Sequence, residues 1–240
     1  MGVEMENSPI AILSGEVMLM NNLSQLFPFW EDLTASEKTH IEMTVQTETY
    51  KKGMLMHRSD STCKGLMAVV SGRLRTYILS EEGREVTLFR VAQGEVCVLS
   101  ASCLLDSITF DVMIEATEDA QVAVIPAAVL NQIMGQNHEV ELYLYKAATE
   151  KFSDVMWTMQ QILFLRIDQR IAQFLWDEMI HRDTVHLQIT HDEIAKYIGS
   201  AREVVTKVMK YLAQENVVEL KRGSVTIIDK EKLRKFCNVT

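Results

Sequence analysis

Hydrophobic and polar positions alternate in short runs through the first half of the chain, and turn residues separate the runs. Gly72, Gly83 and Gly94 recur at a constant interval. Because alternate residues of a strand face opposite sides of a sheet, this pattern predicts a meander of short antiparallel strands that closes into a roll or barrel. The predicted strands are Leu66 to Val70, Arg73 to Leu79, Glu85 to Val91, Thr109 to Ala116 and Ala120 to Ile125.

Helical patterns flank this region. Leu23 to Val45 is expected to be a helical lead-in, in which Thr34 and Glu37 have the spacing of a capping box. Pro126 marks the exit from the roll, because proline does not continue a strand, and a short helix is expected near Ala127 to Gly135.

A long amphipathic helix is predicted from about Glu139 to Arg166, which contains no Pro or Gly. Its apolar residues recur every three or four positions, at 140, 144, 148, 152, 155, 159 and 162. At about 1.5 Å per residue the helix would span about 40 Å. A helix of this length either packs on the chain's own roll or pairs with a partner.

The segment from Thr190 to Leu212 has the pattern of two short helices joined by a glycine turn. The fitting positions are Ile194 and Ala195 on the inner face of the first helix, Gly199 in the turn, and Val205 and Val208 on the second helix. Each helix is also expected to begin at a capping box, one formed by Thr190 and Glu193 and the other by Ser200 and Glu203. This combination predicts a DNA-reading helix-turn-helix, although an ordinary helical hairpin would share some of it.

A small hairpin is expected directly after these helices. Val217 to Leu220 and Val225 to Ile228 are strand-like, and Lys221 and Arg222 form a basic tip between them. Two helices followed by such a hairpin are typical of a winged helix-turn-helix.

The net charge of −9 counts against nucleic-acid binding only until it is divided along the chain. From residue 167 onward there are 12 Lys and Arg against 11 Asp and Glu, and the rest carries 12 against 22. The acidity therefore lies in the N-terminal part. Around the second helix the basic residues are Lys196, Arg202, Lys207, Lys210, Lys221 and Arg222. This local concentration favours a DNA-binding surface over a merely solvated one.

Composition adds limits on location and chemistry. At 240 residues and 48% hydrophobic composition the chain is ordinary for one or two domains, and no segment has the length of a membrane span. Acidic residues, with no Lys or Arg before Lys38, lead us to expect a cytoplasmic protein without a signal peptide. The four cysteines lack zinc-site spacing, and the size gives no need for disulfide cross-links.

The order of these elements resembles the Crp/Fnr family of bacterial transcription regulators. Ser200 to Lys207 is similar to the family's Ser-Arg-Glu-Thr-Val-Ser-Arg recognition helix, and Leu165 to Ala172 resembles the stretch that leads into its DNA-binding domain. We therefore expect an α+β fold with a jelly-roll-like N-terminal β-roll sensor domain (1–136), a long dimerisation helix (137–166) and a C-terminal winged helix-turn-helix (167–240).

The resemblance implies a homodimer on an inverted-repeat operator, with RNA polymerase as a further partner and no membrane. Arg202 would contact guanine and Glu203 the cytosine amine, while Lys207, which replaces the family's Arg, loses the bidentate fork and has phosphate as its alternative target. Glu203 has a competing role in the capping box. The full set of expected DNA-contacting residues is Thr190, His191, Ser200, Arg202, Glu203, Thr206, Lys207, Lys221 and Arg222.

The family's roll often binds a cyclic nucleotide through a Gly-Glu pair and an Arg. Here Gly94 and Glu95 match the pair, but no Arg occurs between Arg90 and Arg166, so a cyclic phosphate would lack its charge-matched partner. The family's iron-sulfur cysteine cluster is also missing before Cys63. We expect no cofactor and an unidentified small-molecule or redox effector. The candidate pocket residues are Gly94, Glu95, Cys97, Ser100, Cys103 and Thr109.

Several features have two interpretations. Cys97 and Cys103 are either redox-active or small buried residues, and His57 is either a ligand or a structural residue. A different class, a cupin-like metal-binding or enzymatic barrel with a helical appendage, requires clustered histidines, and the first 166 residues contain only His40, His57 and His138. We therefore expect a regulator and not an enzyme.

Overall fold

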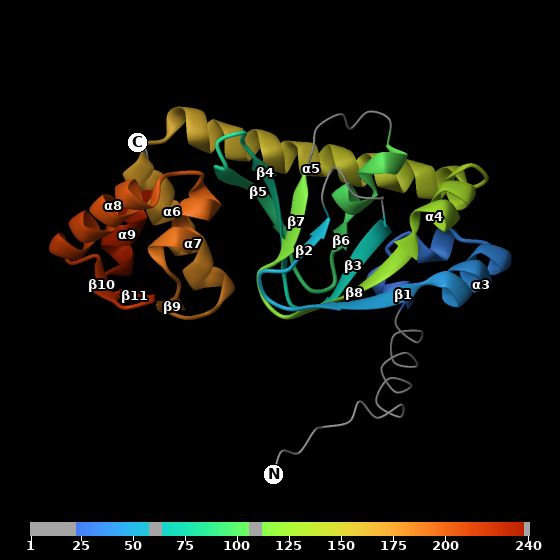
Figure 1. The fold of residues 1–240 in the computed structure, drawn as a ribbon, viewed down its shortest axis with the longest axis horizontal. Helices are drawn as coiled ribbons and strands as arrows, with labels where there is room; N and C mark the ends of the chain where they lie inside the picture. The colour runs from blue at the N-terminus through green and yellow to red at the C-terminus, as the bar shows by residue number, and fades with distance from the viewer. Residues whose placement is uncertain (1–22, 58–63, 106–111, 238–240) are drawn as a thin grey trace, which may run out of the picture. The chain divides into compact units, whose positions relative to one another are not determined.

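The computed structural model describes residues 23–57, 64–105 and 112–237, and these form two compact units (Figure 1). The first unit takes its described residues from 1–76 and 90–152, and the second from 77–89 and 153–240.

Two four-stranded sheets make up the roll. The strand orders are β1-β8-β3-β6 and β2-β7-β4-β5, and the pairs β1/β8, β3/β8, β3/β6 and β2/β7 are antiparallel. The strands are β1 (Gln46–Tyr50), β2 (Leu55–His57), β3 (Gly65–Ser71), β4 (Leu74–Leu79), β5 (Glu85–Val91), β6 (Val96–Cys97), β7 (Met113–Ala116) and β8 (Ala120–Pro126). The predicted antiparallel roll and the α+β class are confirmed.

The predicted strands agree with the structure to within a residue or two, except at one end. The fourth begins at Met113 instead of Thr109, and residues 109–111 lie outside the described part. Strands β1, β2 and β6 were not predicted. β1 is mostly polar and exposed, and β2 and β6 are three and two residues long, so none carries a clear alternation of its own.

Short helices surround the roll. They are α2 (Leu23–Leu26), the 3-10 helix η1 (Trp30–Asp32), α3 (Ala35–Thr44), the 3-10 helix η2 (Val98–Leu104) and α4 (Ala127–Met134). The predicted capping box of α3 is confirmed, because the Glu37 amide donates to Thr34 Oγ1 at 3.3 Å and the Thr34 amide to Glu37 Oε2 at 2.7 Å. Pro126 is the N-cap of α4, as expected from its place at the exit from the roll.

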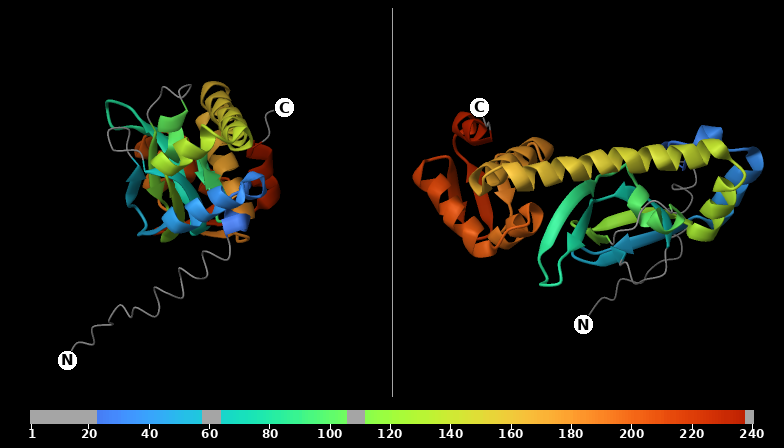
Figure 2. Two further views of the ribbon diagram at one scale, coloured as in Figure 1. Left: turned by 90° about the vertical axis from the view of Figure 1, so that its right-hand side faces the viewer. Right: turned by 90° about the horizontal axis from the view of Figure 1, so that it is seen from above.

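The long helix is α5 (His138–Phe164), one continuous helix of 27 residues (Figure 2). Val140 and Leu144 are buried near its start. Farther along, its large apolar side chains are exposed, including Phe152 at 60% and Leu163 at 68%. Of the expected stripe, Val140 and Leu144 are buried, residues 148, 155 and 162 are half-buried, and Phe152 and Met159 are exposed.

The second unit contains the predicted winged helix-turn-helix. Its elements are α6 (Ile167–His181), β9 (His186–Gln188), α7 (His191–Ile198), α8 (Arg202–Gln214), β10 (Val218–Lys221), β11 (Ser224–Ile227) and α9 (Lys230–Cys237). The wing is confirmed, and β9 adds a third strand in the order β10-β11-β9. One apolar core holds these elements together, and α6 and α9, which the sequence pattern did not predict, contribute Ile171, Leu175 and Leu233 to it.

Gly199 shapes the turn between α7 and α8. Its φ of 62° and ψ of 51° lie in the left-handed region, which a residue with a Cβ adopts only with strain. A Cβ there would also lie 2.8 Å from Cγ2 of Val86 in the same unit. Gly199 therefore has both a conformational and a steric reason to be glycine.

We expect Gly199→Ala to lower the free energy of unfolding by about 1–2 kcal/mol through the left-handed strain alone, with the contact to Val86 adding to it. Chemical denaturation checks this value. Gly223→Ala is the matched control, because Gly223 also has a positive φ of 75° but its Cβ would meet nothing within 4 Å. Equal losses in the two variants would contradict the steric part of this argument.

Candidate nucleic-acid interface

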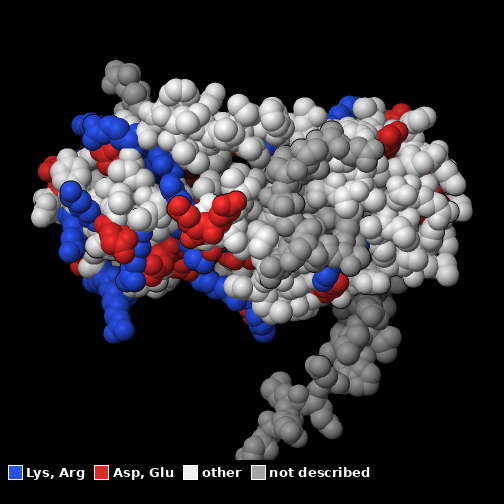
Figure 3. Space-filling model, turned by 45° about the horizontal axis from the view of Figure 1, so that its top comes forward, with Lys and Arg blue, Asp and Glu red and all other residues white. Residues whose placement is uncertain are grey.

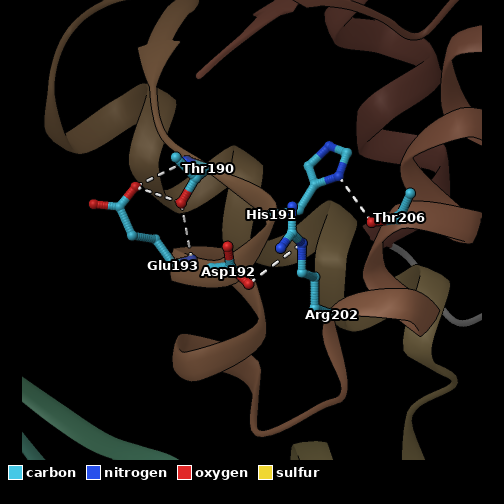
Figure 4. A network of polar contacts seen from close by, with 6 residues as sticks. All are labelled: Thr190, His191, Asp192, Glu193, Arg202 and Thr206. Atoms are coloured by element: carbon cyan, nitrogen blue, oxygen red, sulfur yellow. Dashed lines mark hydrogen bonds and ion pairs between the residues drawn. The ribbon is translucent and has the colours of Figure 1, made fainter. Parts of the chain in front are cut away.

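Helix α7 begins at a reciprocal cap (Figure 4). The Glu193 amide donates to Thr190 Oγ1 at 3.2 Å, and the Thr190 amide donates to Glu193 Oε2 at 2.8 Å. This is the predicted capping box, and it fixes the helix start at His191. Ile194 and Ala195 are buried behind it, as expected.

Helix α8 begins without a side-chain cap, so the predicted box of Ser200 and Glu203 is wrong. The N-cap is Ala201, and α8 starts at Arg202. The reason lies in the preceding helix, because the Ser200 amide donates to the carbonyl of Ala195 at 3.0 Å and so closes the end of α7. One residue of shift puts Glu203 at the second helical position, away from the box geometry.

The two faces of α8 differ sharply. Val205, Met209 and Leu212 are buried, and Val208 is partly buried against the same core. The sequence pattern identified Val205 and Val208 but missed Met209. The opposite face exposes its side chains, namely Arg202, Glu203, Lys207 and Lys210, with Thr206 half-buried beside them. The expected base-contacting residues thus share one solvent-facing surface.

Arg202 forms an ion pair with a residue that the sequence analysis did not select. Its Nε lies 3.4 Å from Oδ1 of Asp192, in the first turn of α7 (Figure 4). Nothing in the spacing predicts this pair, since it depends on how the two helices cross. Glu203 has no hydrogen bond or ion pair within the described residues, so the absence of the cap leaves its carboxylate available.

His191 and Thr206 connect the two helices. His191 Nδ1 and Thr206 Oγ1 are 3.0 Å apart. Burial, with Arg202 and Lys210 nearby, lowers the pKa of His191 below its usual value, although Asp192 acts in the opposite direction. In the free protein these surroundings favour the neutral form of the ring.

The wing presents its basic tip as predicted. Lys221 ends β10 and Arg222 begins the turn, and both are exposed. The Lys221 ammonium lies 3.4 Å from a Glu219 carboxylate oxygen. This pair is more than half exposed, so water screens it and Lys221 remains available for a phosphate.

Figure 3 shows basic and acidic side chains interleaved on one face of the molecule. The basic footprint expected from the sequence consists of Lys196, Arg202, Lys207, Lys210, Lys221 and Arg222. Lys196 is part of it in the sequence, but its ammonium lies 3.1 Å from Glu85 of the hairpin that belongs to the same unit. Lys196 is thereby partly neutralised. The remaining basic residues of the footprint, on α8 and the wing, carry the expected positive surface.

Two arginines bind the backbone of the turn. Arg170 of α6 donates to the carbonyl of Ile198, and Arg84 donates to the carbonyl of Gly199 through Nη2 and, at 3.0 Å, through Nε. These carbonyls close α7, where a helix lacks its own donors and has a partial negative charge. The arginines therefore fix the turn from which α8 departs.

The candidate effector residues have different surroundings. Gly94 and Glu95 lie in an exposed turn, where the Glu95 carboxylate accepts a hydrogen bond from the Ala92 amide at 2.7 Å. Ser100 is fully buried, and its hydroxyl accepts from the Met67 amide at 2.9 Å and donates to the Cys97 carbonyl at 2.6 Å. Ser100 thus links η2 to strands β3 and β6 inside the roll.

The two cysteines among the candidate pocket residues also have different surroundings. Cys97 is a free thiol in the core, and burial raises its pKa to about 11, which matches the interpretation as a small buried residue. Cys103 is disulfide-bonded, although the size of the chain gives no need for such a cross-link. Size and composition do not predict a single cross-link in a chain with an ample core. Thr109 lies outside the described residues.

Among the described residues, no three His, Cys, Asp or Glu side chains gather as a metal site would require. His57 is buried, and burial lowers its pKa. No helix in that part of the chain is both long and apolar enough to cross a membrane.

Comparison with known proteins agrees with this geometry. Residues 169–236 match the Crp-like helix-turn-helix domain, and residues 47–137 match the cyclic nucleotide-binding domain. The crystal structure of a Crp/Fnr-family transcriptional regulator from Eubacterium rectale is 42% identical, with a TM-score of 0.86 over 88% of this chain and 98% of that one.

Two curated relatives are more distant. The transcriptional regulator flp of Lacticaseibacillus casei is 25% identical over 91% of this chain and 99% of its own length. The cAMP-activated global transcriptional regulator CRP of Salmonella typhimurium is 24% identical over 73% of this chain and 86% of its own. A winged helix-turn-helix that follows a β-roll and a long helix, together with these matches, identifies the chain as a DNA-binding transcription regulator of the Crp/Fnr family.

Proposed function

We propose that the protein acts as a homodimer on an inverted-repeat operator, with α8 of each subunit in the major groove. The observation that carries this proposal is the exposed polar face of α8, where Arg202, Glu203 and Lys207 lie opposite the buried Val205 and Met209. Buried residues fix the helix to its domain, and the exposed face can enter the major groove, which is wide enough to admit an α-helix.

The residues of this face suit different parts of DNA. The Arg202 guanidinium pairs with guanine O6 and N7, and the Glu203 carboxylate accepts from the cytosine amine. Lys207 donates as a point charge, which suits phosphate. Thr190, His191, Ser200, Thr206, Lys221 and Arg222 contact the DNA backbone and set the position of α8 without selecting a sequence.

Support for the dimer comes from α5. Seven of its exposed residues follow an alternating spacing of three and four, namely Leu142, Tyr145, Thr149, Phe152, Met156, Met159 and Leu163. This is the seam spacing of a two-stranded coiled coil. All of these side chains except that of Thr149 are large and apolar. Their exposure to water is unfavourable, and pairing with the same row of a second copy removes them from water.

The signal is proposed to be other than cyclic AMP, although the Salmonella relative is named as cAMP-activated. No Arg lies between Arg90 and Arg166 to bind a cyclic phosphate. Arg75, a candidate substitute, is buried with its Nη2 3.1 Å from a Glu115 oxygen, and Arg84 is bonded to the Gly199 carbonyl. The effector remains unidentified, and the pocket assignment to Gly94, Glu95 and Cys103 remains a prediction.

We propose the division into a sensor domain (1–136), a dimerisation helix (137–166) and a DNA-binding domain (167–240), which is compatible with the two family-model matches. It differs from the two structural units, of which the second includes residues 77–89 and begins again at residue 153 within the long helix. RNA polymerase is the proposed further partner and the cytoplasm the proposed location, as operator binding would require. The roll's match to the cyclic nucleotide-binding domain leaves the cupin-like alternative without an observation in its favour.

The test of the function is DNA selection followed by affinity measurement. From a random pool the protein should select an inverted repeat, and Arg202→Ala should weaken that site by about 1–3 kcal/mol and relax one base pair per half-site. Lys221→Ala should weaken all sequences alike, because a phosphate contact carries no sequence information. Unchanged affinity and preference in Arg202→Ala would show that α8 does not read bases as proposed.

A charge introduced into the exposed apolar row of α5 tests the proposed pairing of two α5 helices. Phe152→Glu places a carboxylate in the middle of the apolar row, where pairing would bury it, so light scattering should show a shift from dimer to monomer at micromolar concentration. Glu150→Lys is the control, because Glu150 is exposed but outside the row, and this variant should remain a dimer. A monomeric wild-type protein that still binds a half-site tightly would rule out the dimer.

Cyclic AMP at millimolar concentration should leave both the melting temperature and the operator affinity unchanged, because a ligand shifts an equilibrium only if it prefers one of the states. Thermal unfolding and DNA titration, each with and without the nucleotide, check this. A saturable calorimetric titration coupled to tighter operator binding would contradict the proposal.

A further inference from the structure

The pair formed by Asp192 and Arg202 joins the first turns of α7 and α8. The two residues are ten positions apart in the chain, and the turn at Gly199 brings Asp192 Oδ1 to 3.4 Å from Arg202 Nε (Figure 4). Both side chains are more than half exposed, at 56% and 63%. The pair therefore lies on the surface that is proposed to contact DNA.

The ion pair uses only one of the three guanidinium nitrogens of Arg202, and this decides which nitrogens can contact a base. Asp192 forms an ion pair with Nε of the guanidinium, and within the described residues the Arg202 side chain has no hydrogen bond and no other ion pair. The two terminal nitrogens therefore remain open. A guanine offers two acceptors, O6 and N7, side by side in the major groove, and an arginine that presents both terminal nitrogens meets them end-on.

We propose that Asp192 is a positioning residue that holds the Arg202 side chain for guanine and so sets the base specificity of the recognition helix. This inference rests on the function proposed above. A free arginine side chain has many rotamers and contacts phosphates as readily as bases, whereas one held at Nε loses fewer degrees of freedom when it meets guanine. The carboxylate also repels phosphates, so it disfavours backbone contacts by the same arginine.

A competing explanation is purely structural. Asp192 is an acidic residue in the first turn of α7, where a negative charge stabilises the helix through its dipole. Loss of that role would lower stability and weaken binding to all sequences. Loss of positioning would instead reduce discrimination between sequences and leave the fold intact. The experiment therefore measures stability, general affinity and discrimination separately.

The test uses the full-length chain and Asp192→Asn, with base preferences selected from a random DNA pool and affinities measured at one salt concentration. We expect discrimination at the base pair read by Arg202 to fall by about 3- to 10-fold, which is less than the loss of a whole bidentate contact would cause. Affinity for unrelated DNA should stay equal or rise, since a carboxylate near phosphates is removed, and the melting temperature should not change.

Glu219→Gln is the matched control. Its carboxylate also lies 3.4 Å from a basic side chain of the proposed DNA-contacting set, Lys221, and is also about half exposed. The substitution removes the same charge from the same unit. It should raise affinity for all sequences alike and leave every base preference in place.

The Arg202→Ala background completes the design. There Asp192→Asn should reduce discrimination no further, because the side chain that it positions is gone. If Asp192→Asn keeps the wild-type preferences while Arg202→Ala loses them, positioning is overturned and the proposed function stands. A lower melting temperature with uniform loss of binding assigns Asp192 to helix stability and also overturns positioning. If the wild-type protein prefers no sequence, both proposals are overturned.

Discussion

The left-handed turn at Gly199 is the constraint on which the DNA-binding part depends. The turn lets α8 leave α7 directly, with the Ser200 amide bonded to the Ala195 carbonyl. Arg170 and Arg84 then bind the last carbonyls of α7, which no helical amide satisfies. The turn, the arginines that bind its carbonyls and the buried residues of α8 together fix this geometry, so the direction of α8 does not depend on its exposed residues.

The same turn explains which side chains meet. A helix pair with this crossing brings the first turns of α7 and α8 together, so that His191 contacts Thr206 and Asp192 approaches Arg202. Core residues hold the other sides, with Ile194 and Val205 fully buried. The proposed reading surface is therefore built from the first turns of two helices whose opposite faces are buried.

The sequence predicted what depends on neighbouring residues. The capping boxes at Thr34 and Thr190 and the wing hairpin follow from spacings of a few positions, and all three are confirmed. The box at Ser200 failed because the Ser200 amide bonds backward to α7, a competition that the local pattern does not reveal.

Long-range pairs were beyond the sequence pattern for the same reason. Strand β1 is polar, and it becomes a strand because it pairs with the buried β8 along its whole length. The contact between Asp192 and Arg202 likewise requires the helix crossing to be known. Periodicity finds elements that bury a face of their own, and it misses elements and contacts that exist through a partner distant in the chain.

The protein has a negative net charge, but basic side chains are concentrated on α8 and the wing. With a net charge of −9, the chain as a whole is repelled by DNA at long range, and salt screens that repulsion beyond about 10 Å. At contact distance the basic residues of α8 and the wing dominate, while Asp192 and Glu203 keep carboxylates among them. Such carboxylates repel the phosphates of any DNA and so weaken general binding. They strengthen binding only where a matching base is present. A reading surface of mixed sign thus exchanges general affinity for discrimination, which an all-basic surface of the same shape does not achieve.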